Sequence, residues 1–269
     1  MATGFYIGVD GKARKVKGGY IGVDGVARKI KKGYIGDANG VARLCWSAFD
    51  GDPVFANNTW ENIALACQLN AVPDSWLVGD QKTMTVNGVD YTIDVIGKNH
   101  DDYADGSGKA PLTFQLHECY SSGYGMNNTS SNSGSWGSSA MRTSRLTSIF
   151  QLLPSEVQSA IREVSKLTAN GFRDSTITTT ADKLFLLSEI EVFNIAEYSH
   201  SGEGNQYEYY AKGNSKQKQY VDSTVNKPWW FRSPSRTSGE RFVVKTADGT
   251  DATQANADTE YGVSFAFCF

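Results

Sequence analysis

The stretch Asn226-Lys227-Pro228-Trp229-Trp230-Phe231-Arg232-Ser233-Pro234 has the composition of a β-strand. Because side chains alternate between the two faces of a strand, Trp229 and Phe231 share one face, and Trp230 and Arg232 share the other. One of the two tryptophans is therefore expected in a hydrophobic core. The chain has 269 residues, of which 40% are hydrophobic, so it can bury a core of sizeable extent.

The rest of the C-terminal third is also rich in β-strand patterns. Residues 241–246 predict a strand, Asp248-Gly249 a turn and residues 262–269 a last strand. This last strand carries large hydrophobic side chains at alternate positions, which is typical of a strand buried in a sheet. The side chains expected on its buried face are Val263, Phe265, Phe267 and Phe269.

Towards the middle of the chain, Asn87-Gly88 separates two strand patterns, residues 83–86 and 89–95. Asn-Gly favours the tight turns that join antiparallel strands, so a β-hairpin is predicted here. Residues 184–187 form a short apolar run that predicts a further buried strand. In the second arm of the hairpin, Val89, Tyr91, Ile93 and Val95 are expected to face inward, and Asp90, Thr92 and Asp94 outward.

Three helices are predicted. Asn58-Thr59-Trp60-Glu61 begins the first, with a side-chain cap and a Glu three residues later. A second covers residues 141–150, and a third begins with Pro154 at its first position. Their spacing predicts buried stripes made of Trp60, Ile63, Ala64 and Cys67 in the first helix, and of Val157, Ala160, Ile161 and Val164 in the third.

The N-terminus contains three near-copies of one motif with a period of 14 residues, at residues 6–11, 20–25 and 34–40. The period suits an out-and-back β-hairpin, and Asp-Gly favours the turn. An isolated hairpin is marginally stable in water, so these repeats need a neighbour. We expect them to mediate attachment or oligomerisation through the repeated residues Tyr6, Tyr20, Tyr34, Arg14, Arg28 and Arg43.

Charge separates residues 1–43 from the remainder. They contain nine Lys and Arg against three Asp, a net charge of +6, which leaves −9 for residues 44–269 out of the total of −3. We therefore predict two domains: a basic repeat arm, 1–43, and a larger domain, 44–269. An acidic partner for the arm is one interpretation, with an anionic cell-wall polymer or a protein favoured over nucleic acid. The alternative is that lysines protect exposed strand edges.

The larger domain carries an ordered set of motifs at residues 136–142, 153–154, 182–192, 229–234 and 265–268. These motifs resemble an uncharacterised domain family that is common in prophages and gut Firmicutes. That family is more distantly similar to the C-type-lectin-like fold of formylglycine-generating enzymes and retroelement variable adhesins. The resemblance implies an α+β, C-type-lectin-like domain, although the Trp-Asn-Asp calcium signature of lectins is missing. The repeats resemble those that precede this domain in phage proteins.

Aromatic and polar side chains near the C-terminus are candidates for ligand binding. Tyrosine and tryptophan make amphipathic recognition surfaces at low entropic cost. The alternative is that these aromatic residues belong to the sheet core and its rim. The candidates are Trp230, Arg232, Tyr207, Tyr209 and Tyr210.

Metal and catalytic sites have weaker signals. One loop contains three carboxylates close together, those of Asp101, Asp102 and Asp105. Calcium sites are built from such oxygen ligands, but the spacing here is not that of an EF-hand. The alternative is a polar loop in which Asp and Asn bond their own backbone. His200-Ser201 lacks the strand-turn-helix context of a nucleophile. Formylglycine-type oxidation would need a thiolate pair, and Cys268 has no cysteine near it in sequence. We expect no enzyme and no cofactor.

These observations lead to the hypothesis of a phage virion protein, part of the tail, baseplate or fibre. Its lectin-like domain would bind a host-surface glycan or protein, and its arm would attach it to other virion proteins or to further copies, as a trimer. The sequence contains no run of about 18 apolar residues, so we expect no membrane insertion. No signal peptide is recognised at residues 1–4, so we expect a cytoplasmic product that reaches the virion. Alternatives are a capsid decoration protein, a host-encoded binding module and, last, a formylglycine-generating oxidase.

Overall fold

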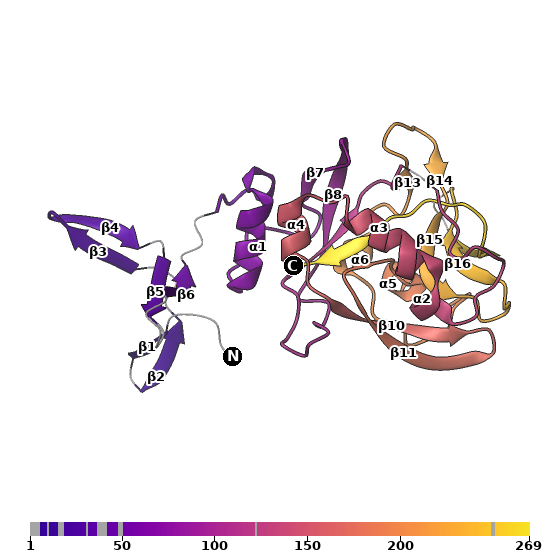
Figure 1. The fold of residues 1–269 in the computed structure, drawn as a ribbon, viewed down its shortest axis with the longest axis horizontal. Coiled ribbons are helices and arrows are strands. Elements are labelled where there is room, and N and C mark those ends of the chain that lie inside the picture. Colours follow the sequence, from indigo (N-terminus) through magenta and orange to yellow (C-terminus); the bar gives the residue numbers. More distant parts are fainter. Residues whose placement is uncertain are drawn as a thin grey trace. The chain divides into compact units, whose positions relative to one another are not determined.

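The computed structural model describes residues 6–9, 11–15, 19–30, 32–36, 42–47, 51–121, 123–248 and 251–269. The chain divides into two compact units, Met1–Ser75 and Trp76–Phe269. Short helices and several small sheets make it an α+β protein, which confirms the expected class (Figure 1). Within the described residues, no helix is long and apolar enough to cross a bilayer.

The three N-terminal repeats form three antiparallel hairpins, as their period and turn residues predict. At the turn of the second hairpin, Asp24 and Gly25 have positive φ of 52° and 75°, which is why Asp-Gly suits this position. Each hairpin is a separate two-stranded sheet. The paired strands are β1 (Tyr6–Val9) with β2 (Lys12–Lys15), β3 (Gly19–Val23) with β4 (Val26–Ile30), and β5 (Lys32–Gly36) with β6 (Ala42–Ser47).

Two apolar side chains of the second hairpin are exposed: Ile21 is 54% and Val26 is 57% accessible. A pair of short strands has too little mass to cover them, in keeping with the marginal stability expected of a lone hairpin. The side chains to which an attachment role was assigned lie outside the described part of the structure, so that role stays a prediction. They are those of Tyr6, Tyr20, Tyr34, Arg14, Arg28 and Arg43.

The helix α1 (Trp60–Gln68) follows a short 3-10 turn, η1 (Phe55–Asn57), and begins within the predicted motif, one residue later than a cap at Asn58 with Glu61 three residues on would place it. The N-cap is Thr59, whose hydroxyl accepts a hydrogen bond from the amide of Asn62 at 3.2 Å. Its buried face consists of Trp60, Ile63, Ala66 and Cys67, so Ala66 takes the place predicted for Ala64.

The central sheet of the second unit has five strands in the order β12-β18-β9-β8-β7. The last strand of the sequence, β18, is therefore an interior strand, and its two neighbours come from distant parts of the chain. This explains why residues 262–269 are all buried. The strands are β7 (Gln81–Val86), β8 (Val89–Lys98), β9 (Leu112–Leu116), β12 (Leu184–Phe185) and β18 (Ala266–Cys268).

The hairpin of β7 and β8 confirms the Asn-Gly turn, because Asn87 and Gly88 both have positive φ. One expectation on it was wrong: Asp94 is 1% exposed and does not face outward. Its carboxylate accepts hydrogen bonds from the side chains of Gln81 at 2.8 Å and His117 at 2.8 Å, which stabilise it in the interior.

The third predicted helix is shorter than its apolar pattern suggests. The helix α4 covers only Ser155–Ala160, with Pro154 as its N-cap. The backbone becomes extended at Ile161, because the amide of Arg162 donates a hydrogen bond to the carbonyl of Cys268 at 3.1 Å. Val164 then starts strand β10 and does not extend the helical stripe.

The remaining elements of the second unit are short helices and small sheets. Residues 141–150 are helical as predicted, although the first turn is a π-helix, η2 (Met141–Arg145). Strands β10 and β11 form a long ribbon (Figure 1), and β15, β16 and β17 form a three-stranded sheet. The bounds are α2 (Ser135–Ser138), α3 (Leu146–Phe150), β10 (Val164–Gly171), β11 (Asp174–Asp182), α5 (Glu189–Phe193), α6 (Glu208–Ala211), β13 (Lys218–Gln219), β14 (Asn226–Lys227), β15 (Trp229–Pro234), β16 (Arg241–Lys245) and β17 (Ala252–Asn256).

Strand β15 is buried along its whole length. Trp229 and Phe231 pack edge to face with ring centroids 4.8 Å apart, which confirms that they share a face. Trp230 and Arg232, on the other face, are both 0% exposed. Trp229 and Trp230 therefore both belong to the core, whereas the alternation of side chains along the strand predicted burial of only one of them. The predicted strand at residues 241–246 is confirmed by β16, whereas Gly249 of the predicted turn lies outside the described residues.

Truncation of Phe267 should test the interior position of β18. Phe267 is 0% exposed and packs on Phe114 at a centroid distance of 5.1 Å. We expect Phe267→Ala to lower the free energy of unfolding by about 3–5 kcal/mol, because it removes buried surface and leaves a cavity. Phe172→Ala is the matched control: Phe172 is 39% exposed, so the loss should stay below about 1 kcal/mol. Equal losses in urea titrations of the two variants would contradict this placement.

Candidate functional site

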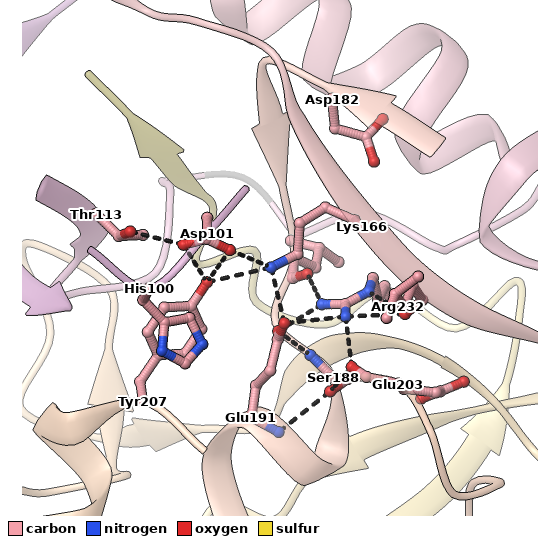
Figure 2. Close-up of polar contacts among 12 residues, drawn as sticks. His100, Asp101, Thr113, Lys166, Asp182, Ser188, Glu191, Glu203, Tyr207 and Arg232 are labelled. Carbon is pink, nitrogen blue, oxygen red and sulfur yellow. Dashed lines mark hydrogen bonds and ion pairs between the residues drawn. The ribbon is translucent and has the colours of Figure 1, made fainter. Parts of the chain in front are cut away.

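Five ionisable side chains meet in the interior of the second unit (Figure 2). Each comes from a different element: the loop after β8, strand β10, helix α5, the loop before α6, and strand β15. None is more than 4% exposed. We call this set the buried charge network; its members are Asp101, Lys166, Glu191, Glu203 and Arg232.

Lys166 joins two of the carboxylates. Its Nζ donates to Asp101 Oδ1 and to Glu191 Oε1, both at 2.7 Å, and to the hydroxyl of Tyr207 at 3.2 Å. Burial alone would lower the pKa of Lys166, but the carboxylates of Asp101 and Glu191 raise it above its ordinary value. Burial is likewise the largest effect on Asp101 and opposes its ionisation, yet the charges of Lys166 and His100 and the hydrogen bonds from Lys166 and Thr113 together outweigh it, and the pKa falls to about 2. Both groups are therefore charged.

Arg232 makes a two-pronged ion pair with Glu191. Its Nη1 donates to Glu191 Oε2 at 2.5 Å, and its Nη2 donates to Glu191 Oε1 at 3.0 Å. The other N–H groups reach the carbonyls of Leu186, Leu167 and Glu203. A guanidinium is well suited to this position because its planar fork matches a carboxylate and stays charged when buried.

Glu191 is placed by a local sequence signal. The Ser188 hydroxyl accepts a hydrogen bond from the amide of Glu191 at 3.1 Å, and the Glu191 carboxylate accepts one from the amide of Ser188 at 2.9 Å. This capping box begins α5. Burial would raise the pKa of Glu191, but Arg232 and Lys166 lower it below the ordinary value.

Glu203 has a different electrostatic environment. Its carboxylate accepts hydrogen bonds from the amide of Ala169 at 2.9 Å and from the hydroxyl of Ser233. Burial raises the pKa of Glu203 to about 7, although Ser233 and Arg232 oppose the shift. The network therefore contains two cations, two fixed carboxylates and one carboxyl group that titrates near neutrality.

Every polar atom of the network has a partner inside the protein. Throughout the described residues, no buried side-chain nitrogen or oxygen lacks a hydrogen bond. A site that acts on a ligand needs groups that reach it, whereas these groups are enclosed and face one another. The arrangement therefore connects β10, α5 and β15, and it acts as an internal support of the fold.

The structure corrects the expected placement of the five candidate ligand-binding residues. All five are buried, which agrees with the alternative that they belong to the core. The hydroxyl of Tyr207 donates to Asp101 at 2.9 Å, and Arg232 is the guanidinium of the network. The alternation of side chains along a strand assigns each residue to a face, but it does not show whether other parts of the protein cover both faces. The candidates and their exposed fractions are Trp230 (0%), Arg232 (0%), Tyr207 (0%), Tyr209 (6%) and Tyr210 (2%).

The candidate calcium ligands diverge. Asp101 pairs with Lys166 in the interior, Asp102 with Lys109 at 3.0 Å, and Asp105 with Arg162 at 2.6 Å. Each carboxylate therefore has its own cation. No group of three or more metal-ligating side chains occurs within the described residues. The loop fits the alternative of a polar loop with internal hydrogen bonds.

The residues considered for catalysis, His200 with Ser201 and Cys268, each have partners of their own. His200 Nε2 donates to the carbonyl of Gly171 at 3.0 Å, and Ser201 beside it is exposed. The Cys268 thiol is buried beside Thr113 and Asp101, and its burial, with the Asp101 charge, raises its pKa well above the ordinary value. That thiol is therefore protonated. The expectation that the protein is not an enzyme remains a prediction.

The fold and the network together define an α+β domain in which charged motif residues support the interior. The chain belongs to a family described as "Domain of unknown function (DUF6273)", whose model matches residues 52–269. No curated protein and no solved structure matches the chain significantly. The hairpins of β1 to β6 lie before the matched residues.

Removal of the guanidinium should destabilise the fold strongly. Arg232→Met leaves Glu191 buried without its closest cation, so we expect a loss of about 3–5 kcal/mol in the free energy of unfolding. The control is Lys212→Ala, which breaks an exposed pair with Glu208 at 2.7 Å, where both side chains are 51% exposed. That change should cost at most about 0.5 kcal/mol. Similar urea midpoints for both variants would show that the network does not support the fold.

Glu203 should make stability depend on pH. Its pKa is about 7 in the folded protein against an ordinary value of 4.5, so the folded state binds the proton more tightly. Its contribution to stability is complete below about pH 4.5 and is lost as pH rises through about 7.

We expect the wild type to lose up to about 3 kcal/mol relative to Glu203→Gln between pH 5 and pH 8, at about 1.4 kcal/mol per pKa unit. Glutamine does not titrate; its amide oxygen can accept the hydrogen bond from the Ala169 amide, and its amide nitrogen can donate to the Ser233 hydroxyl. Urea unfolding of both proteins at each pH measures the difference, and two parallel stability curves would contradict the expectation.

Proposed function

We propose that this protein is a non-enzymatic attachment protein of a phage particle, part of the tail tip, baseplate or fibre. In this proposal the unit Trp76–Phe269 presents a rigid surface to the host, and the N-terminal hairpins fix the protein to the particle or to other copies. The observation that carries the proposal is the enclosure of the buried charge network. It gives the unit a fixed interior and leaves recognition to its surface.

The hairpins support an attachment role for the arm. They are separate two-stranded sheets, and the second exposes Ile21 and Val26. Residues 1–43 also carry a net charge of +6, against −9 for residues 44–269. Exposed apolar side chains and open strand edges are stabilised by association, and opposite charges between the two parts favour contacts between copies. The phage context rests on the resemblance of the repeats and motifs.

Deletion of residues 1–43 should separate assembly from folding. We expect the full chain to form a homo-oligomer, a trimer, in light scattering coupled to size exclusion. The deleted chain should be monomeric and keep the far-ultraviolet circular dichroism and melting temperature of the larger unit, because the five-stranded sheet and the buried charge network lie within Trp76–Phe269. A monomeric full chain, or an oligomer that survives the deletion, would refute the role of the arm.

Antibody labelling of intact particles tests the location directly. Gold particles at the tail tip, baseplate or fibre would support the proposal. Labelling of the capsid shell would contradict the tail assignment and favour a decoration protein, and particles without label would overturn the virion assignment altogether.

A further inference from the structure

Three half-buried tyrosines gather on one face of the second unit. Tyr124 and Tyr261 lie opposite each other in an antiparallel bridge, in which the amide of Tyr124 donates to the carbonyl of Tyr261 at 3.0 Å. Side chains of such a pair lie on the same side of the backbone. The hydroxyl of Tyr220 lies over Gly123, where an added Cβ would stand 3.0 Å from it. We call Tyr124, Tyr220 and Tyr261 the tyrosine patch.

The backbone beneath the patch is fixed by the core. Trp230 Nε1 donates to the carbonyl of Tyr124 at 2.7 Å, and the Trp230 ring packs on Tyr261 with centroids 5.2 Å apart. A Cβ added at Gly262 would stand 2.4 Å from the Sγ of Cys119, so the chain there approaches its neighbour as closely as only glycine permits. A surface held in this way loses little conformational entropy when a ligand binds.

The polar groups of the patch are available to a ligand. The hydroxyls of Tyr124, Tyr220 and Tyr261 make no hydrogen bond to another described residue, unlike those of the buried Tyr207 and Tyr210. Each half-buried ring thus carries a hydroxyl that can both donate and accept a hydrogen bond. This combination is typical of residues that recognise amphipathic ligands.

The charges around the patch have both signs. The guanidinium of Arg145 lies 5.9 Å from the Tyr124 ring centroid, and the Nζ of Lys227 lies 5.6 Å from that of Tyr220. Glu260 is close enough to raise the pKa of Tyr220, after the larger effects of burial and Cys119. A mixed rim of this kind does not create the strong single-sign field that selects a polyanion.

Backbone pairing disfavours a peptide strand as the ligand. The amide and carbonyl of Tyr124 both bond to Tyr261, and the amide of Cys119 bonds to the carbonyl of Gln219 at 2.7 Å. A peptide that adds to a sheet needs a free row of such groups. A sugar chain needs none, because its C–H faces pack on aromatic rings and its hydroxyls exchange hydrogen bonds with phenol groups.

We propose that the tyrosine patch binds a neutral oligosaccharide. This inference rests on the proposed function, since it names the ligand class and the surface through which the larger unit meets its host. Tyr124, Tyr220 and Tyr261 contact the sugar, while Trp230 acts as a positioning residue beneath them.

The test uses the purified full chain on an array of neutral oligosaccharides built from glucose, galactose, rhamnose and N-acetylglucosamine, with sialylated and sulfated oligosaccharides alongside. We expect retention on at least one neutral structure and measure its Kd by isothermal titration calorimetry. Tyr220→Ala should weaken binding at least tenfold, and Tyr261→Phe, which keeps the ring, by a smaller factor. Phe172→Ala is the control because Phe172 is an exposed aromatic residue of the β10–β11 turn. It should leave the Kd unchanged.

Retention of acidic oligosaccharides only, retention of none, or an equal effect of Phe172→Ala and Tyr220→Ala would overturn the inference. Melting temperatures of the variants show whether a loss reflects unfolding, and Tyr261→Phe keeps the test decisive if Tyr220→Ala is unstable. Adhesion to intact bacterial cells distinguishes the two proposals. If the full chain adheres and Tyr220→Ala adheres equally, the saccharide inference fails and the attachment function stands; if neither sugars nor cells retain it, both fail.

Discussion

The ion pair between Arg232 and Glu191 is the interaction on which the larger unit depends. A guanidinium and a carboxylate in a protein interior must compensate each other, because each loses its hydration and neither can be left alone without a large penalty. The carboxylate of Glu191 is compensated by two cations, because it pairs with both Arg232 and Lys166. The positions of α5, β10 and β15 are therefore coupled, since no one of them can move without breaking a charged contact.

The buried charge network explains what two of the sequence motifs do, those at residues 182–192 and 229–234. Ser188 and Glu191 form a capping box, and the Glu191 carboxylate uses its oxygens both for that cap and for the ion pairs. Arg232 occupies the interior of the strand that contains both tryptophans. The charged residues that the sequence suggests for ligand binding thus support the fold, and the recognition role that we propose is assigned to the surface of this unit.

Trp230 links that interior to the proposed recognition surface. It lies two residues before Arg232 in β15, and its ring nitrogen donates a hydrogen bond to the carbonyl of Tyr124. Strand β15 therefore contacts both the buried charge network, through Arg232, and the tyrosine patch, through Trp230. The hairpins of the arm have no comparable interior in the described residues, which is why association, and not self-contained folding, is the physical role proposed for them.

The sequence by itself determined the local structure. The repeat period predicted the three hairpins, Asn87-Gly88 predicted the β7–β8 turn, and alternating hydrophobic residues predicted the last strand, because turn geometry and side-chain periodicity act over a few neighbouring residues. Only the tertiary structure decided which distant groups meet. Lys166 and Asp101 are 65 residues apart, and the tyrosine patch joins three separate segments. Burial of Asp94 and Arg232 was also decided there, since alternation assigns a face but cannot tell whether another layer covers it.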